Sequence, residues 1–189
     1  GRPQLLGVDG SAPGAVDDTL VDRDPVTGAT LPRNSVLGQV HNHAAFTRVV
    51  PFNDLAALEA ALQQGDVACL LAEPALTNFG LVPPEPGYWA QARALCRTHG
   101  SLFVCDETHT ISTALGGYAR AHGLEPDFMV VGKAVAGGLP CAVYGFTQAV
   151  ADRMVSAKNA APEGHSGIGT TLAGNALTLA ALQASLQHL

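Results

Sequence analysis

The sequence predicts an α/β fold in which helices cover both faces of a mostly parallel sheet, a three-layer α/β/α arrangement. From residue 53 onward, strand-like apolar runs alternate with helical patterns, and such alternation indicates parallel strands joined by right-handed crossovers. The runs are apolar at consecutive positions, which is typical of strands covered on both faces. Hydrophobic residues make up 47% of the 189 positions and charged residues only 14%, so a folded interior is expected.

The expected elements follow one another along the chain. Asn53 can cap a helix that carries Leu55, Leu58 and Leu62 at helical spacing. Gly100 is expected to close a helix that begins at Tyr88. Strands are expected at 67–72, 101–105, 127–131 and 140–146, and further helices at 88–99, 118–122, 148–155 and 170–189.

Residues 1–52 are expected to form an irregular lead-in segment, and residues 53–189 the core of the domain. The lead-in is rich in glycine, proline and aspartate, and short strands are expected only near 37–40 and 48–52. A stretch of this length without clear elements is unusual in a compact domain, which suggests that it packs on something outside the sequence.

Charge and hydropathy exclude several classes of partner. The formal net charge is −6 and no cluster of Lys and Arg occurs, so no nucleic-acid partner is expected. The longest apolar runs are too short to cross a bilayer, so no membrane partner is expected. Three of the four cysteines (Cys69, Cys105 and Cys141) lie within apolar runs, which favours reduced core thiols in a cytoplasmic protein.

Three ionisable residues follow successive predicted strands: Glu73, Asp106 and Lys133. In parallel sheets the ligand lies beyond the carboxyl ends of the strands, so these side chains are expected to share one site. Lys133 lies between Gly132 and small residues, and we expect it to be partly desolvated and therefore a usable nucleophile for carbonyls. The alternative is a surface lysine paired with Asp106 or Asp127.

Five segments, taken together, resemble the class III aminotransferases, and most closely their glutamate-1-semialdehyde aminomutase branch. The resemblance covers residues 53–189 and implies the large domain of pyridoxal-phosphate (PLP) enzymes of fold type I. It implies PLP as cofactor and the transfer of an amino group between an amino compound and a keto acid or aldehyde. The segments are Glu73-Pro74, Pro83-Pro84, Ser101–Thr110, Glu125–Pro140 and Gly169–Leu182.

The resemblance implies a role for each matching residue near the cofactor. Lys133 is the Schiff-base lysine and moves a proton during the reaction, and Asp106 partners the pyridine nitrogen. Thr108 packs on the ring face, where the family usually has valine. His109 lies near the 3′-oxygen of the cofactor or, equally, points into a loop. Glu73 lies on the substrate side or anchors the turn before Pro74.

The resemblance also implies a homodimer with shared active sites. Thr171, or its neighbour Thr170, reaches the phosphate of the cofactor in the partner subunit, in a glycine-rich segment whose backbone N–H groups can bind an anion. The alternative is a monomer in which Thr171 only caps the last helix. The phosphate-binding segment and the small C-terminal domain of the family would lie outside residues 1–189, so the chain is expected to be a large-domain fragment that is inactive on its own.

Three other interpretations stay open. The first is an aminomutase rather than a transaminase, since both use the same chemistry and differ in whether the keto product leaves. The second is a non-catalytic domain with the PLP fold. The third, the less favoured one, is a metal site; its candidate ligands are His41, His43, Asp106, Glu107 and His109. We expect no metal at the site.

Overall fold

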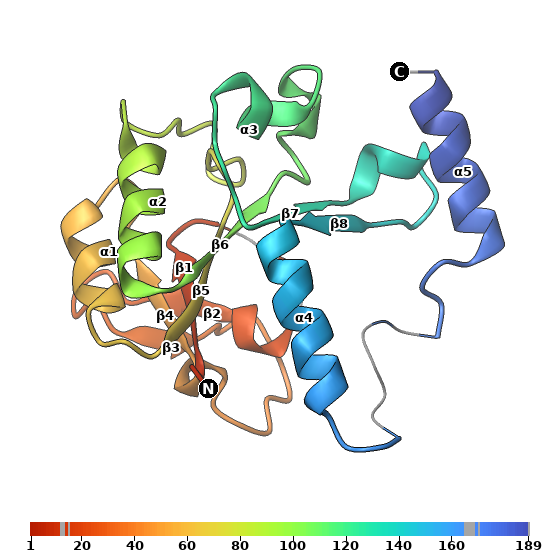
Figure 1. Ribbon diagram of the computed structural model, residues 1–189. Helices are drawn as coiled ribbons and strands as arrows, with labels where there is room; N and C mark the ends of the chain where they lie inside the picture. The colour runs from red at the N-terminus through yellow and green to blue at the C-terminus, as the bar shows by residue number, and fades with distance from the viewer. Residues whose placement is uncertain (12–13, 15, 165–168, 170, 189) are drawn as a thin grey trace.

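The computed structural model describes every residue except 12–13, 15, 165–168, 170 and 189. Its centre is a six-stranded sheet, in which neighbouring strands pair parallel except for the last pair (Figure 1). The α/β fold with a mostly parallel sheet is therefore confirmed. In sheet order the strands are β4 (Thr47–Val50), β1 (Gln4–Val8), β5 (Val67–Ala72), β6 (Leu102–Asp106), β7 (Phe128–Val131) and β8 (Val143–Phe146).

The first fifty residues are more regular than expected. β1 lies inside the sheet, between β4 and β5, although the sequence predicted no strand there. The strand expected near 48–52 corresponds to β4, whereas residues 37–40 form no strand. A small antiparallel hairpin, β2 (Val21–Arg23) and β3 (Thr30–Pro32), packs beside β4. The expectation that residues 1–52 are irregular is therefore wrong for the segments that build the sheet.

Two helices cover one face of the sheet and enclose the core. They are α1 (Leu55–Leu62) and α2 (Tyr88–His99), which lie side by side (Figure 1). The Trp89 ring stacks on Phe103 of β6 with centroids 5.1 Å apart, and its indole N–H donates to the Pro74 carbonyl at 2.8 Å. This contact ties α2 to the loop that follows β5.

The C-terminal end of α2 is capped as expected, whereas the N-terminal end of α1 is capped by a different residue from the one expected. Gly100 closes α2 in the left-handed conformation, as expected. The cap of α1 is Asp54, whose carboxylate accepts from the Ala57 N–H at 2.8 Å. Asn53, the predicted cap, instead has a positive φ of 63° and accepts from the Glu85 N–H at 2.8 Å.

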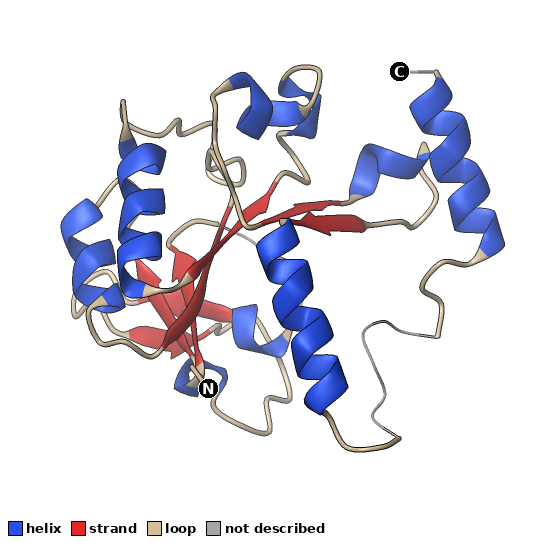
Figure 2. Cartoon of the chain, in the orientation of Figure 1, coloured by secondary structure: helices blue, strands red, loops and turns tan. Residues whose placement is uncertain are grey.

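The opposite face of the sheet is covered less completely. Leu71, Val104 and Val130 are only half-buried in this chain. The helix α4 (Gln148–Ala160) buries only Val150 among its residues. Figure 2 shows β7 and β8 extending away from the rest of the sheet toward the last helix. The third layer of the expected arrangement is thus only partly formed by the described residues.

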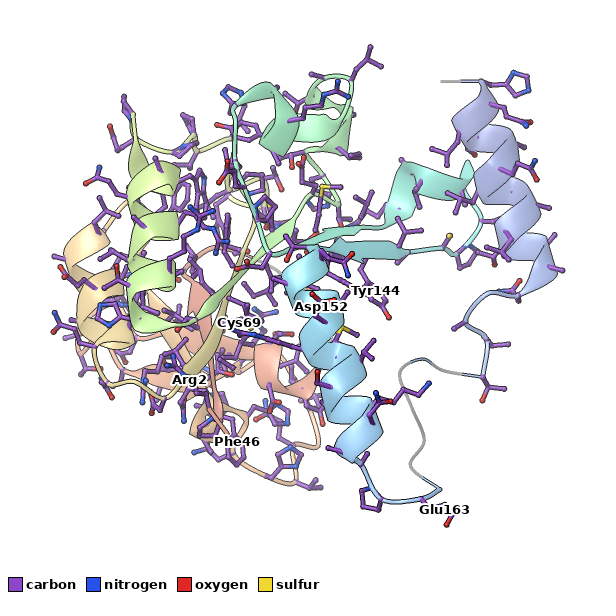
Figure 3. The ribbon with its side chains drawn as sticks, viewed as in Figure 1. Arg2, Phe46, Cys69, Tyr144, Asp152 and Glu163 are labelled. Carbon is purple, nitrogen blue, oxygen red and sulfur yellow. The ribbon has the colours of Figure 1, made fainter. Side chains whose placement is uncertain are left out.

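The last helix, α5 (Ala176–Gln187), begins later than expected. Asn175 caps it by accepting from the Thr178 N–H at 2.9 Å, so it does not start at residue 170. It packs on a 3-10 helix, η4 (Lys133–Ala136), and its side chains spread into open space on the other sides (Figure 3). No residue of α5 is buried within this chain, and Leu177, Leu179 and Leu186 are each at least half exposed, so its apolar side chains do not pack inward here.

The four cysteines are free thiols, but of the three expected in the core only Cys105 is buried, whereas Cys69 and Cys141 are half-buried. Burial raises the pKa of Cys96 to about 12 and also raises that of Cys105, so both are neutral, unreactive core groups. Within the described part of the chain, no helix combines the length and apolar character needed to cross a bilayer.

Candidate active site

The ends of three parallel strands meet at one cavity. Glu73 follows β5, Asp106 ends β6 and Lys133 follows β7, as the strand order predicted. The cavity has a volume of about 180 Å³, and it is lined by Gly14, Glu73, Asp106, Thr108, His109, Val130 and Lys133. The structure thus brings the three ionisable residues together at one cavity.

The Asp106 carboxylate is held by its own turn. Asp106 pairs with Val130 on β7, and its Oδ1 accepts from the Thr108 N–H at 2.9 Å. The residue is half-buried. One oxygen is thus fixed by the backbone, and the other can accept a hydrogen bond from a ligand in the cavity.

Lys133 has an unusual backbone conformation. It has a φ of 52°, in the left-handed region that residues other than glycine rarely adopt. Strained backbone of this kind concentrates at functional sites, where the surrounding structure holds it. The expected desolvation is wrong for this chain alone, because Lys133 is exposed and only the cavity wall on one side screens it. No described acidic side chain forms an ion pair with it, so the surface ion-pair alternative has no support.

A hydrogen-bonded network joins β5 to the loop after β6. The Thr77 hydroxyl donates to Glu73 Oε2 at 2.6 Å, and it also lies 2.6 Å from His109 Nδ1. Asn78 donates to Glu73 Oε1 at 3.2 Å, and Ser11 lies 3.5 Å from that oxygen. Glu73 is only 3% exposed, so its buried carboxylate is held by these partners and anchors the turn after Pro74.

His109 was expected either to lie near the cofactor or to point into a loop, and its contacts within this network distinguish the two. Its ring lines the cavity, and Nδ1 also lies 3.5 Å from Glu73 Oε2. The ring therefore points toward the site rather than into a free loop. Thr77 and Ser11 were not singled out from the sequence. Ser11 follows β1 as Glu73 follows β5, so the signal existed but depended on recognising β1.

The three threonines expected near the cofactor lie in different surroundings, and only two of them are among the described residues. Thr108 lines the cavity, and its side chain faces Gly132, where an added Cβ would lie 3.6 Å from the Thr108 side chain. Thr171 is exposed in a turn that precedes α5, so Asn175 and not Thr171 caps that helix. Thr170 lies outside the described residues.

Glu107, a candidate metal ligand, is buried and has a structural role. It is fully buried, and its carboxylate accepts from the N–H groups of Tyr118 and Ala119 at 2.7 Å and from the Thr110 hydroxyl at 3.1 Å. It thereby satisfies the first N–H groups of α3 (Gly117–Ala121). All its bonds point into the protein, so it is a capping residue and is removed from the candidate ligands.

The metal alternative at this edge of the sheet finds no support among the residues that the structure describes. Among the described residues, the one group of three metal-ligating side chains consists of Asp17, His41 and His43, and it includes neither Asp106 nor His109.

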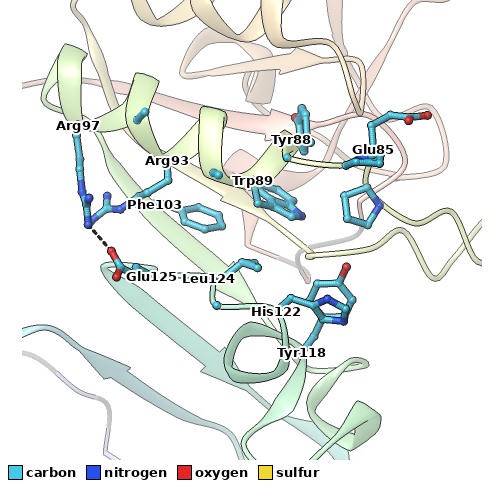
Figure 4. Close-up of a pocket in the computed structure, with 16 residues that line it drawn as sticks. Glu85, Tyr88, Trp89, Arg93, Arg97, Phe103, Tyr118, His122, Leu124 and Glu125 are labelled. Atoms are coloured by element: carbon cyan, nitrogen blue, oxygen red, sulfur yellow. Dashed lines mark hydrogen bonds and ion pairs between the residues drawn. The ribbon is translucent and has the colours of Figure 1, made fainter.

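A larger cavity of about 560 Å³ lies elsewhere, between α2 and residues 118–125 (Figure 4). Its wall includes Trp89 and Phe103, and an ion pair of 2.8 Å between Arg97 and Glu125 closes one end. No lysine lines it. It therefore lacks the lysine amine that the smaller cavity places beside a carboxylate, and we place the candidate active site at the smaller one.

Comparison with known protein families identifies relatives across most of the chain. The family model described as aminotransferase class-III matches residues 21–189. The glutamate-1-semialdehyde 2,1-aminomutase of Sorangium cellulosum (strain So ce56) is 39% identical over 191 residues, which cover 100% of this chain and 42% of that protein. The chain thus spans less than half the length of the curated relatives that it matches.

Solved structures resemble the fold over nearly the whole chain. A glutamate-1-semialdehyde-aminomutase from Pseudomonas aeruginosa PAO1 is 47% identical with a TM-score of 0.89, covering 97% of this chain and 41% of that one. A lysine-to-alanine variant of a glutamate-1-semialdehyde-aminomutase from the same strain was solved in complex with PMP. An omega-transaminase from Sphaerobacter thermophilus is 25% identical with a TM-score of 0.85, covering 100% of this chain and 44% of that one.

Proposed function

Because the chain belongs to the class III aminotransferase family, we propose that it supplies the lysine and aspartate for a PLP-dependent transfer of an amino group. The amino group passes between an amino compound and a keto acid or aldehyde. The observation that carries this proposal is the convergence of Lys133 and Asp106, from the ends of two neighbouring strands, on one cavity. The relatives that bind PMP or act as transaminases support the same chemistry.

The residues present fit the cofactor by their chemistry. The cavity offers an exposed primary amine at Lys133 and a carboxylate at Asp106, of which one oxygen is already held by the Thr108 N–H. These are the groups needed to bind an aldehyde and to face a pyridinium nitrogen. When bound, the cofactor supplies a ring that withdraws electrons from the carbon bearing the amino group.

The chain's own residues would then position and move protons. Lys133 Nζ removes the proton from the substrate carbon that carries the amino group and returns a proton later. Asp106 keeps the ring nitrogen protonated through its negative charge, which strengthens the pull on electrons. Thr108 packs beside the ring, and the held carboxylate of Glu73 faces the substrate side together with His109.

The alternative function is that of an aminomutase, which the relatives from Sorangium and Pseudomonas favour by name. An aminomutase turns one substrate into its isomer, whereas a transaminase needs a donor and an acceptor. Product analysis with a single substrate, and then with a donor and acceptor pair, separates the two. An isomeric product formed without any acceptor would assign the aminomutase reaction.

The assembly and location belong to the same proposal. We assign a homodimer with shared sites, because three of the four leucines of α5 are exposed and Thr171 is exposed as well. We place the protein in the cytoplasm, which the free thiols favour.

The test of the proposal uses the fact that the chain has only two lysines, Lys133 and Lys158. The protein is incubated with PLP and reduced with borohydride, and its peptides are analysed by mass spectrometry. We expect the covalent adduct on Lys133 and its loss in Lys133→Ala. The matched control is Lys158→Ala, an exposed position on α4, which should keep the adduct. An adduct that remains in Lys133→Ala and maps to Lys158 would overturn the assignment.

A further inference from the structure

Asp17, His41 and His43 form a cluster outside the proposed active site, and we propose that it binds a divalent transition-metal ion such as Zn²⁺. Each residue offers one ligand atom, and these atoms all lie within 4.8 Å of one another. None of the three lines the cavity at Lys133. The site is therefore separate from the amino-transfer chemistry and does not depend on it.

The state of His43 points to a missing ligand. Its side chain is 4% exposed, and its buried Nδ1 has no hydrogen-bond partner among the described residues. Buried polar atoms are nearly always satisfied, because leaving one unpaired costs its desolvation free energy. The His43 ring also lies against that of His41, with centroids 4.7 Å apart. A bound cation would give these two imidazoles a common partner.

Local hydrogen bonds hold the two segments that carry the cluster. Asp17 begins the 3-10 helix η1 (Asp17–Thr19), and His43 begins η2 (His43–Ala45), which packs against it. The Thr47 hydroxyl donates to the Asp18 carbonyl at 2.5 Å and so ties η1 to β4. The Asn42 side chain accepts from the Ala44 N–H at 3.1 Å and fixes the start of η2. The ligands therefore come from a prearranged framework.

The residue types and spacing suit a transition metal better than Ca²⁺ or Mg²⁺. Imidazole nitrogens prefer Zn²⁺ and similar ions, whereas Ca²⁺ and Mg²⁺ prefer oxygen ligands. Zn–N distances of about 2.1 Å put tetrahedral ligand atoms roughly 3.4 Å apart. His41 Nε2 and Asp17 Oδ2 already lie 3.8 Å apart, and their side chains are 54% and 65% exposed, so small rotations bring them into range. Three ligands leave a position open for water.

The experiment measures Zn²⁺ binding by isothermal titration calorimetry on chelator-treated protein, with metal analysis after dialysis. The variants are Asp17→Asn and His41→Ala, because both side chains are exposed and their loss should leave the fold intact. His188→Ala, at an exposed histidine after α5, is the matched control. All four proteins carry the same cofactor content, and thermal unfolding is followed with and without Zn²⁺.

We expect one Zn²⁺ per chain in the wild type and a higher Tm when it is bound. Loss of an outer partner of a metal ligand typically costs 10–100-fold in affinity, so loss of a ligand itself should weaken binding roughly ten-fold or more. Each of Asp17→Asn and His41→Ala should show this loss, while His188→Ala binds as the wild type does. The proposal fails if the wild type binds no stoichiometric Zn²⁺, if neither cluster variant weakens binding, or if the control weakens it equally.

Discussion

At the scale of single residues, the two oxygens of Asp106 have different surroundings. Oδ1 accepts from the Thr108 N–H at 2.9 Å, whereas no hydrogen bond from a described residue reaches Oδ2. The bond at Oδ1 fixes the carboxylate plane in a half-buried position. A negative charge that is already oriented loses little free energy to reorganisation when a cation approaches, and this is what makes such a group effective in catalysis.

Replacing Asp106 by Asn should keep the fold and some cofactor but lower kcat roughly 10²-fold or more, by analogy with the loss of other preorganised electrostatic groups. The amide keeps the shape and can still accept from Thr108, but it carries no charge to hold the ring nitrogen protonated. Steady-state amino transfer by the full-length protein measures the effect, and Tm checks the fold. The matched control is Asp152→Asn, at an exposed residue of α4 whose carboxylate accepts a hydrogen bond from the Gln148 side chain. A near-normal rate in Asp106→Asn would refute the role.

Residue identity could be predicted where the strand ends were recognised, and not elsewhere. Glu73, Asp106 and Lys133 were found because each follows an apolar run. Their hydrogen-bond partners were not, because the contacts of Thr77 and Ser11 depend on how loops fold back over the sheet. The exposure of Lys133 also differed from expectation, since flanking small residues say nothing about which segments cover a side chain.

At the scale of elements, α3 depends on a residue that lies outside it. The helix has only five residues, and its N-cap, Gly116, has no side chain to accept a bond. Instead, the Glu107 carboxylate, in the loop after β6, accepts hydrogen bonds from N–H groups of the helix. An α-carbon substituent at Gly117 would lie 2.6 Å from Glu107 Oε2, so glycine is required for the carboxylate to come so close.

Glu107→Ala should therefore lower the free energy of unfolding by roughly 3 kcal/mol, because it leaves two N–H groups and a hydroxyl without their acceptor. Chemical denaturation followed by circular dichroism measures the change. Glu59→Ala, on the exposed side of α1, is the control and should change stability by no more than about 0.5 kcal/mol. Equal stability of the two variants would show that α3 does not depend on this cap.

Elements were predicted well where one local signal agreed with the packing. The bounds of β5 and α2 match the expectation, because an apolar run and a helical stripe are each bounded by clear stop signals. β1 was missed because Gly7 interrupts a run of only five residues in a glycine-rich setting. The sequence pattern predicts too early a start for α5, because the apolar spacing continues upstream of Asn175, the residue that caps the helix.

At the scale of the whole molecule, the apolar surface of this chain is unevenly covered. One sheet face is sealed by α1 and α2, whereas half-buried side chains remain on the other face. The sequence pattern predicted strands covered on both faces, and the described residues cover only one of these faces fully.

The proposed homodimer predicts that two different defective subunits restore activity when mixed. Thr171 is exposed in the turn before α5, and three of the four leucines of α5 are also exposed, so a second copy can cover both. If Thr171 binds the cofactor phosphate of its partner, Thr171→Ala should weaken PLP retention without changing Tm of the cofactor-free protein. The mixed dimer with Lys133→Ala then has one site with both defects and one with neither.

Free exchange makes half of all dimers mixed, and each has one intact site, so activity should recover to about one quarter of the wild type. The assay uses the full-length protein at limiting PLP, where each variant alone is inactive, and mass-tagged subunits verify that exchange has occurred. A mixture of Lys133→Ala with tagged Lys133→Ala controls for effects of mixing and should stay inactive. If subunits exchange and activity does not recover, Thr171 serves its own subunit or does not bind the cofactor. The sites would then not be shared in this way, whatever the number of subunits, because complementation requires each subunit to contribute a different residue to one site.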